Sequence, residues 1–278
     1  MHISVLGCGW LGFPAARHLL SLGYSVSGST TDEKKLPLLD NNEVTPYLIR
    51  IENKINCNEC TKFWKSDILF LNIPPGRKRG DVLNRHPAQI KAIVEQVKEV
   101  GHINWIIFAG STSVYATYGG ITTEEDADPD TASSQSGKAL LECEKILKEE
   151  STFDTTILRF GGLYGYERHP VKYLAGRKEI DKANRPVNLV HQDDCVQIIG
   201  KIIQMNVRNE TFNVVSDGHP PRREFYTSAA NHFGFETPVF KTDSNEKPTE
   251  EYKIVSNKKL KEKLNYSFLY PNPMDHTP

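Results

Sequence analysis

The chain has 278 residues, 38% of them hydrophobic and 25% charged, which is typical of a globular protein with one large domain or a domain and a smaller lobe. Its 34 Lys and Arg against 35 Asp and Glu give a net charge of −1, so no basic field indicates a nucleic-acid partner. No apolar run is long enough for a membrane helix, and the first apolar segment is too short for a signal peptide. We therefore expect a cytoplasmic protein that acts on a small molecule, without nucleic-acid or membrane partners.

The cysteines agree with a reducing compartment, because their number is odd and their spacing forms no disulfide framework. Cys57 and Cys60 form a C-x-x-C, but no second pair or His cluster stands nearby to complete a zinc site. A redox pair would need a thioredoxin-like context, which this segment does not obviously supply. We expect two free thiols in a loop and no metal.

The first half of the chain alternates predicted strands and helices. Ile90, Ile93, Val94 and Val97 fall on one helical face, with Pro87 at a plausible first turn, and a second apolar stripe predicts a helix over about 137–149. Continuous apolar strands that alternate with helices indicate a parallel sheet covered on both faces. The expected strands cover residues 3–6, a segment after Gly23, and residues 47–51, 68–73, 105–109 and 156–160.

The second half is less regular, and no internal repeat or low-complexity linker separates it from the first. It predicts strands over 186–191 and 211–216 with a helix over 192–205 between them, a helix over 222–233, and a last helix over 257–264 with Ser256 as its N-cap. We expect a Rossmann-like, doubly wound α/β domain over 1–160 and a smaller α/β lobe over 161–278. The lobe is expected to be interlaced, with about 186–216 returning to the Rossmann sheet.

A glycine-rich turn follows the first predicted strand directly and opens a helix. In Gly7-Cys8-Gly9-Trp10-Leu11-Gly12, the first glycine permits a tight turn, the second lets the backbone approach a pyrophosphate, and the third allows close packing of helix on strand. The pyrophosphate would lie at the helix N-terminus, where amide groups and the helix dipole favour negative charge. This context predicts a dinucleotide site.

The end of the second strand bears on the choice between NAD and NADP. NAD sites usually place Asp or Glu there, whereas this chain has Ser29, Thr30 and Thr31, followed by Lys34 and Lys35. Hydroxyls and nearby ammonium groups suit a 2′-phosphate that a carboxylate would repel. We favour NADP, while Asp32 keeps NAD open, and the two lysines can instead be a solvated face.

Several further segments stand in order along the whole chain. They are Asn72-Ile-Pro-Pro-Gly76, Phe108-Ala-Gly-Ser-Thr-Ser-Val-Tyr115, Leu158-Arg-Phe-Gly-Gly-Leu-Tyr-Gly165, Asn188-Leu-Val-His-Gln-Asp-Asp194, Phe212-Asn-Val-Val-Ser216 and Arg222-Arg-Glu-Phe-Tyr226. Together these segments resemble the extended branch of the short-chain dehydrogenase/reductase superfamily. The glycine turn, the loop after the fourth strand and the start of the helix over 222–233 look most like its atypical YeeZ-like group.

The chain departs from the family in its catalytic groups. The family uses a Ser or Thr with a Tyr-x-x-x-Lys, in which the Lys lowers the pKa of the Tyr. Ser111 matches the Ser/Thr position, but the resemblance places Ser136 at the Tyr position and Leu140 at the Lys position. An aliphatic hydroxyl does not replace a phenol without a base to activate it. Lys138 is two residues early and points to another helix face, so the usual proton relay is missing.

The candidate site residues follow from the turn and the resemblance. Ser111 and Tyr115 are the catalytic candidates, although Ser111 can equally cap a turn and the family's Tyr at position 115 is commonly a wall or substrate contact. Tyr164 and His191 are substrate candidates, with a satisfied buried histidine as the alternative for His191. Arg159 is expected to pair with a carboxylate. The cofactor candidates are Gly7, Gly9, Trp10, Leu11, Gly12, Ser29, Thr30, Thr31, Asn72, Ile73, Pro74, Pro75 and Phe160.

Two functional hypotheses remain from the sequence. The first is an NADP-dependent oxidoreductase or epimerase-like enzyme acting on a small polar, sugar-nucleotide-like substrate, with proton transfer from Ser111, Tyr115 or water. The second is a catalytically inactive dinucleotide-binding sensor or scaffold. The resemblance also implies a homodimer formed through two helices that flank the central sheet.

Overall fold

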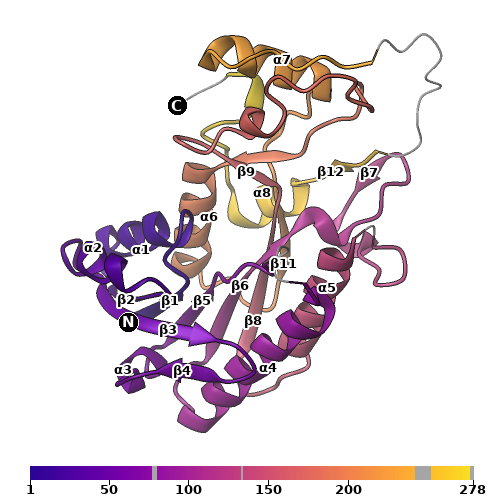
Figure 1. Ribbon diagram of the computed structural model, residues 1–278. Coiled ribbons are helices and arrows are strands. Elements are labelled where there is room, and N and C mark those ends of the chain that lie inside the picture. The colour runs from indigo at the N-terminus through magenta and orange to yellow at the C-terminus, as the bar shows by residue number, and fades with distance from the viewer. Residues whose placement is uncertain (77–79, 133, 242–251, 276–278) are drawn as a thin grey trace. The chain divides into compact units, whose positions relative to one another are not determined.

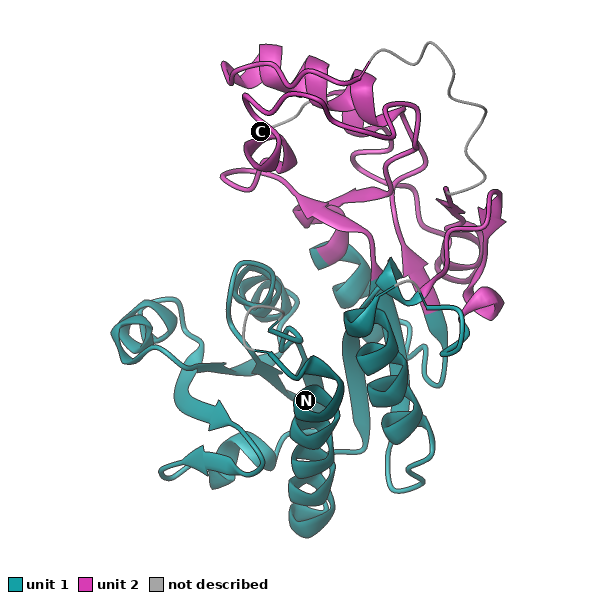
Figure 2. Ribbon diagram, turned by 45° about the vertical axis from the view of Figure 1, so that its right-hand side comes forward, with its two compact units in different colours: residues 1–114, 128–159, 196–211 teal, residues 115–127, 160–195, 212–278 magenta. Residues whose placement is uncertain are grey.

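The computed structural model describes residues 1–76, 80–132, 134–241 and 252–275. The chain forms two compact units, each made of several chain segments (Figure 2). Unit 1 comprises residues 1–114, 128–159 and 196–211, and unit 2 comprises residues 115–127, 160–195 and 212–278.

The central feature is an eight-stranded, mainly parallel sheet in the order β11-β8-β6-β5-β1-β2-β3-β4 (Figure 1). β1 (His2–Leu6) lies between β2 and β5, with Val5 in register with Gly28 and Phe70. The strand order reverses at β1, which is the switch point where doubly wound sheets bind ligands. The predicted fold class is thus confirmed. The other strands are β2 (Ser25–Thr30), β3 (Thr45–Ile51), the antiparallel β4 (Ile55–Cys57), β5 (Ile68–Leu71), β6 (Trp105–Ser111), β8 (Asp154–Phe160) and β11 (Thr211–Val214).

Four of the longer helices pack as two pairs, α4 with α5 and α1 with α6. α4 and α5 lie side by side (Figure 1). α1 packs closely on α6, because a Cβ on Gly200 would lie only 2.6 Å from Nε2 of His18. Right-handed crossovers on either side of the switch point place helices on both faces of such a sheet. The helices are α1 (Gly12–Ser21), α2 (Leu36–Asp40), α3 (Thr61–Trp64), α4 (Val82–Val100), α5 (Gln135–Lys148) and α6 (Gln192–Gln204), which enters unit 1 at Val196.

Two helix starts differ from the sequence prediction. α4 begins at Val82, so Pro87 lies inside the helix and not in its first turn. The early start is supported by the buried Val82 and by Arg85, whose guanidinium donates to the carbonyls of Pro75 and Gly76. α5 begins two residues early because Ser134 caps it, accepting a hydrogen bond from the Gly137 amide at 3.0 Å.

In its described residues, unit 2 contains two small parallel sheets, two α-helices and the first turn of α6. β9 (Gly162–Tyr164) pairs with β10 (Leu189–His191), and β7 (Ile121–Thr122) pairs with β12 (Ile254–Val255). Of the expected segment 186–216, only β11 pairs in the eight-stranded sheet. The helices are α7 (Arg222–Phe233) and α8 (Lys258–Leu264), and three buried apolar clusters share Tyr226 at their edges.

Two expectations in the second half need correction. The strand predicted from residue 186 begins only at Leu189, because Pro186 has no N–H to donate and forms one isolated bridge with Pro221. Asn257, not Ser256, is the N-cap residue of α8. The Ser256 hydroxyl accepts a long hydrogen bond from the Lys258 amide at 3.3 Å.

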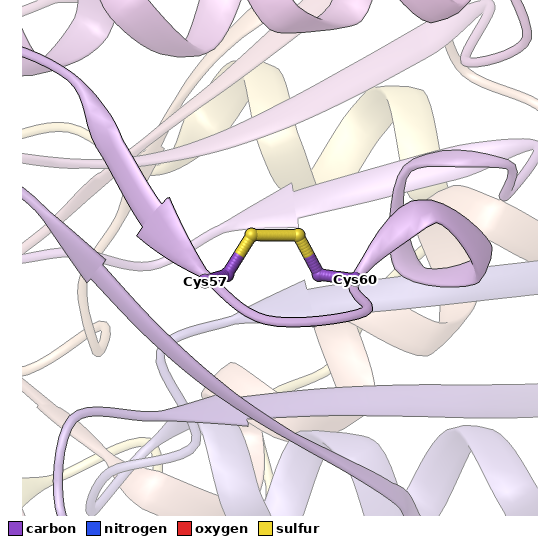
Figure 3. The surroundings of a disulfide bond; sticks show 2 residues. All are labelled: Cys57 and Cys60. Atoms are coloured by element: carbon purple, nitrogen blue, oxygen red, sulfur yellow. A yellow bond between two sulfur atoms is a disulfide. The ribbon is translucent and has the colours of Figure 1, made fainter.

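Cys57 and Cys60 are joined by a disulfide between the end of β4 and the start of α3 (Figure 3). The expectation of two free thiols was therefore wrong, since the turn between β4 and α3 brings the two side chains together. The other three cysteines, Cys8, Cys143 and Cys195, are free and buried. Within the described ranges, no helix is long and apolar enough to cross a lipid bilayer.

Candidate functional site

The glycine turn of unit 1 connects β1 to α1 and is held by β2 and by the residue after β5. The Gly7 amide donates to Oγ of Ser29 at 2.9 Å, and the Cys8 amide donates to the Ser29 carbonyl at 2.8 Å. From the other side, Nδ2 of Asn72 donates to the Gly7 carbonyl at 2.9 Å. The turn is thus fixed to both strands that flank β1 at the switch point.

The three glycines of the turn meet different constraints. Gly7 has φ +108°, and a Cβ there would lie 2.4 Å from the Asn72 carbonyl oxygen. A Cβ on Gly12 would lie 2.1 Å from the Gly7 carbonyl oxygen. Gly9 is exposed, its φ is outside the left-handed region, and a Cβ on it would meet no atom of the described residues within 4 Å. The fold therefore requires glycine at positions 7 and 12 and leaves open space at position 9.

Hydroxyl groups occupy the end of β2, and most are already hydrogen-bonded. Ser29 is buried and binds Gly7, while Oγ1 of Thr30 accepts from the Asp32 amide at 3.1 Å. Thr31 is exposed. The Asp32 carboxylate accepts from the Lys34 amide at 3.1 Å and so caps the short helix Glu33–Lys35. Asp32, the first acidic residue after this strand, therefore has its carboxylate hydrogen-bonded to the backbone two residues further on.

The loop after β5 carries four of the predicted cofactor residues. Asn72, Ile73 and Pro75 are half-buried, whereas Pro74 is exposed. A Cβ on Gly7 would lie 3.7 Å from Cγ2 of Ile73, so Ile73 borders the turn together with Asn72. In the turn itself, Leu11 is buried, Trp10 is half-buried, and no side chain caps the first turn of α1. An uncapped helix start suits an anionic ligand.

Ser111 ends β6, and the N-terminus of α5 packs against the residues that follow it. Oγ of Ser111 accepts from the Ser113 amide at 3.2 Å. A Cβ on Gly137 would lie 2.2 Å from the Ser113 carbonyl oxygen, so only glycine permits this close approach. Ser136 and Leu140 on α5 are both buried. Ser111 therefore closes a turn, in which its hydroxyl oxygen is an acceptor.

Arg159 on β8 forms a buried ion pair with Glu144 on α5, which confirms its expected structural role. Nε donates to Oε1 at 3.0 Å and Nη2 donates to Oε2 at 2.6 Å. Both oxygens of the carboxylate are engaged in this pair, which links the helix after Ser111 to the central sheet.

Tyr115 lies in unit 2 and is fully buried. Its hydroxyl donates to Oδ1 of Asn213 at 2.6 Å, and the backbone N–H of Asn213 donates to Oε1 of Glu124 at 2.7 Å. The Tyr115 carbonyl accepts a hydrogen bond from Nζ of Lys253 at 2.8 Å. Sequence reasoning missed both contacts: Asn213 stands in the quoted segment 212–216, which gave no sign of a contact with Tyr115, and Lys253 stands in no quoted motif.

Tyr164 and His191 come together in unit 2 at the ends of β9 and β10. Their ring centres lie 5.1 Å apart, and a Cβ on Gly165 would lie 2.6 Å from Nε2 of His191. Burial raises the pKa of Tyr164, the charge of Asp194 raises it further, and the Ser216 hydroxyl opposes the shift. Both rings are buried, as is Phe160 at the end of β8. The Tyr270 ring packs against His191 at a tilt of 42°, with ring centres 3.8 Å apart.

The fold and the glycine turn define the class of protein. UDP-glucose 4-epimerase from Thermotoga maritima, solved with UDP-glucose, has a similar fold with a TM-score of 0.74 at 19% identity, covering 97% of this chain and 94% of that one. UDP-glucuronic acid 4-epimerase from Bacillus cereus in complex with NAD gives 0.75 at 16% identity, covering 96% and 91%. The chain thus has the fold of these epimerases, a mainly parallel Rossmann-like α/β fold.

The particular family follows from a full-length relative. Protein YeeZ of Escherichia coli strain K12 is 30% identical over 275 residues, which cover 98% of this chain and 97% of YeeZ. The chain belongs to the YeeZ family. A search of family models found none that matches. Among the described residues, no group of three or more His, Cys, Asp or Glu side chains could hold a metal ion.

Proposed function

We propose that unit 1 binds a nicotinamide dinucleotide at the Gly7–Gly12 turn. The open space at Gly9 is the observation that carries this proposal. Gly7 and Gly12 are explained by contacts within the protein, whereas Gly9 has neither a left-handed φ nor a neighbouring atom that would exclude a side chain. A diphosphate lying against the backbone accounts for glycine there. Asn72, Ile73 and Leu11 border the same turn and would hold the ligand.

NADP is proposed as the preferred form. Ser29 and Thr30 place hydroxyls at the end of β2, and Thr31, Lys34 and Lys35 are exposed beside it. The Asp32 carboxylate accepts a hydrogen bond from the Lys34 amide and so caps the short helix Glu33–Lys35. A 2′-phosphate at this strand end would therefore find the ammonium groups of Lys34 and Lys35 nearby. The Asp32 carboxylate, which would repel it, is already hydrogen-bonded to the backbone. The Bacillus cereus epimerase of similar fold is described in complex with NAD, so NADH is the necessary competitor in any test.

Calorimetric titration with NADPH and NADH tests the cofactor proposal. We expect tighter binding of NADPH, and at least about tenfold weaker binding by Gly9→Ala, because the new methyl group would occupy the diphosphate's position. The melting temperature of Gly9→Ala should equal that of the wild type, since its Cβ meets no protein atom. Ser21→Ala, at the opposite end of α1, is the matched control and should bind normally. Equal binding by wild type and Gly9→Ala would refute the site, and tighter binding of NADH would refute the NADP preference.

We propose that the protein is an oxidoreductase or epimerase-like enzyme on a small polar, sugar-nucleotide-like substrate. The cofactor would supply the hydride chemistry. The buried Tyr115 hydroxyl is already donated to Asn213, which favours Ser111 or water as the proton-transfer group. Buried Tyr164 and His191 are proposed as substrate-side residues of unit 2. The sugar nucleotides named for the epimerases of similar fold support this substrate class, and turnover of NADPH with such compounds and with simple carbonyls tests it.

A dinucleotide-binding sensor or scaffold is the second candidate. Two observations favour it. The Tyr115 hydroxyl already donates its proton to Asn213, and the resemblance places Ser136 and Leu140 where the superfamily has its catalytic Tyr and Lys. Tight NADPH binding without turnover on the full panel of substrates would support it. A Ser111→Ala variant that abolishes a measured turnover would exclude it.

We also propose a cytoplasmic location and a homodimer formed through α4 and α5. The resemblance to the short-chain dehydrogenases/reductases implies a dimer through two helices that flank the central sheet, and α4 and α5 pack side by side in unit 1. Light scattering should give twice the monomer mass, and a monomer at micromolar concentration would contradict the dimer.

A further inference from the structure

The disulfide of unit 1 lies at the edge of the central sheet. Cys57 ends β4, the last strand in the sheet order, and Cys60 immediately precedes α3 (Figure 3). Both cysteines are half-buried, and Asn58 and Glu59 between them are exposed. Among the described residues, no further strand pairs with the outer side of β4. The disulfide is therefore accessible to a small thiol in solution without unfolding of the chain.

The backbone on each side of the disulfide is held by contacts that do not involve sulfur. β4 pairs with β3, with Cys57 in register with Ile49. In α3, Phe63 and Trp64 are fully buried, and Oγ of Ser4 on β1 donates to the Phe63 carbonyl at 2.6 Å. β4 and α3 should therefore keep their places when the bond between the two sulfur atoms is broken.

A purely structural role explains little of this pair. The bond joins residues that are only three positions apart in the sequence. A disulfide stabilises a fold mainly by restricting the unfolded chain, and this effect becomes smaller as the closed loop becomes shorter. A loop of this length therefore adds little to the stability that the contacts of β4 and α3 already provide.

The same short spacing suits thiol–disulfide exchange. The Cα atoms of Cys57 and Cys60 are 6.0 Å apart, within the range that a disulfide spans. Because the anchored backbone keeps this separation in the reduced form, the second thiol stays beside a mixed disulfide on the first and displaces the attached group. The other three cysteines are buried, so they do not compete for the exchange.

We propose that Cys57 and Cys60 form a reversible redox site that exchanges with a low-molecular-weight thiol such as glutathione. A thiolate of this compound attacks one of the two sulfur atoms, the Cys57–Cys60 bond breaks, a mixed disulfide forms, and the released cysteine takes up a proton. A second thiolate attacks the outer sulfur of the mixed disulfide and releases the other cysteine, which is protonated in turn. The protein disulfide is thus reduced to two thiols while two small thiols are oxidised to their disulfide, and the reverse reaction restores the bond. This proposal does not depend on the proposed cofactor or substrate.

Equilibration of the full chain with graded ratios of reduced to oxidised glutathione tests the site. Acid quenching, alkylation of free thiols and intact-mass measurement give the oxidised fraction. We expect excess reduced glutathione to convert the native disulfide completely and reversibly, and denaturant to accelerate the reduction by no more than about tenfold, because the bond is accessible in the folded protein. The circular dichroism spectra of the two forms should coincide. A larger acceleration in denaturant, or loss of the native spectrum on reduction, would overturn the proposal.

Single-cysteine variants test the exchange within the pair. Cys57→Ser and Cys60→Ser should each form a mixed disulfide with oxidised glutathione that lasts at least about tenfold longer than any adduct on the reduced wild type, because the thiol that would displace glutathione is missing. The double variant with both substitutions controls for the three buried cysteines and should form no adduct while native. An adduct on the native double variant, the lack of one on both single variants, or an equally lasting adduct on the wild type would contradict the site.

Discussion

The ion pair of Glu144 and Arg159 shows how single residues fix the region after Ser111. Both side chains are almost completely buried, with 2% and 4% of their surface exposed. Burying two charges costs free energy, and two hydrogen bonds of 3.0 and 2.6 Å between the guanidinium and the carboxylate offset this cost. A Cβ on Gly110 would lie 3.5 Å from Oε1 of Glu144, so the pair also packs against the backbone of β6.

Removal of one partner of this pair should destabilise the protein strongly. We expect Glu144→Gln to lower the free energy of unfolding by about 3 kcal/mol, because the Arg159 charge would remain buried without a counter-charge. Urea denaturation followed by circular dichroism measures this loss. Glu142→Gln, an exposed position on the same helix, is the control and should change stability by less than about 0.5 kcal/mol. A loss below about 1 kcal/mol in Glu144→Gln would contradict the argument.

At the scale of elements, the segment after α8 is attached to the first turn of α6 through one carboxylate. Oδ1 of Asp194 accepts from the Tyr266 hydroxyl at 2.8 Å and from the Leu269 amide at 2.7 Å, and Oδ2 accepts from the Tyr270 amide at 3.0 Å. Burial raises the pKa of Asp194, and these three donors oppose the shift. The attachment also places the Tyr270 ring over His191.

Two variants separate the contributions to this attachment. Asp194→Ala leaves two backbone amides and one hydroxyl without their acceptor and should cost about 3 kcal/mol of unfolding free energy, whereas Tyr266→Phe removes one hydrogen bond and should cost about 1 kcal/mol. Thermal unfolding orders the two variants, and limited proteolysis should cut residues 266–275 faster in Asp194→Ala. Equal melting temperatures for the two variants would be inconsistent with a three-donor attachment.

At the scale of the whole molecule, the five cysteines fall into two chemical classes. Cys57 and Cys60 are half-buried and joined by a disulfide. Cys8, Cys143 and Cys195 are buried, and burial raises the pKa of Cys8 to about 12 and raises the pKa of the other two as well. Since the thiolate is the reactive form, these three should be inert in the folded protein.

A thiol count under native and denaturing conditions tests this division. With a chromogenic disulfide reagent, the native protein should show no rapid reaction, two thiols after mild reduction, and all five after reduction in denaturant. The Cys57→Ser, Cys60→Ser double variant should show none in the native state whether reduced or not. Rapid reaction of a third thiol in the folded protein would contradict the burial of Cys8, Cys143 and Cys195.

The sequence alone determined the fold class, the place of the glycine turn and the longer strands and helices, but not the short elements β4, α3, β7 and β12. These features depend on local patterns: apolar strands of the right length, helical stripes, and glycines at positions 7, 9 and 12. α7 was predicted with its observed bounds, Arg222–Phe233. Each such signal lies within one or two turns of chain, where steric rules and periodicity act directly.

Only the tertiary structure decided how side chains that are distant in sequence meet. The Tyr115 hydroxyl is fixed by Asn213, 98 residues away, and the Tyr115 carbonyl by Lys253, 138 residues away. The disulfide and the early start of α4 also depend on turns and contacts that periodicity does not encode. Hydrogen bonds and buried charges need partners in space, and the chain supplies those partners from wherever the fold brings them.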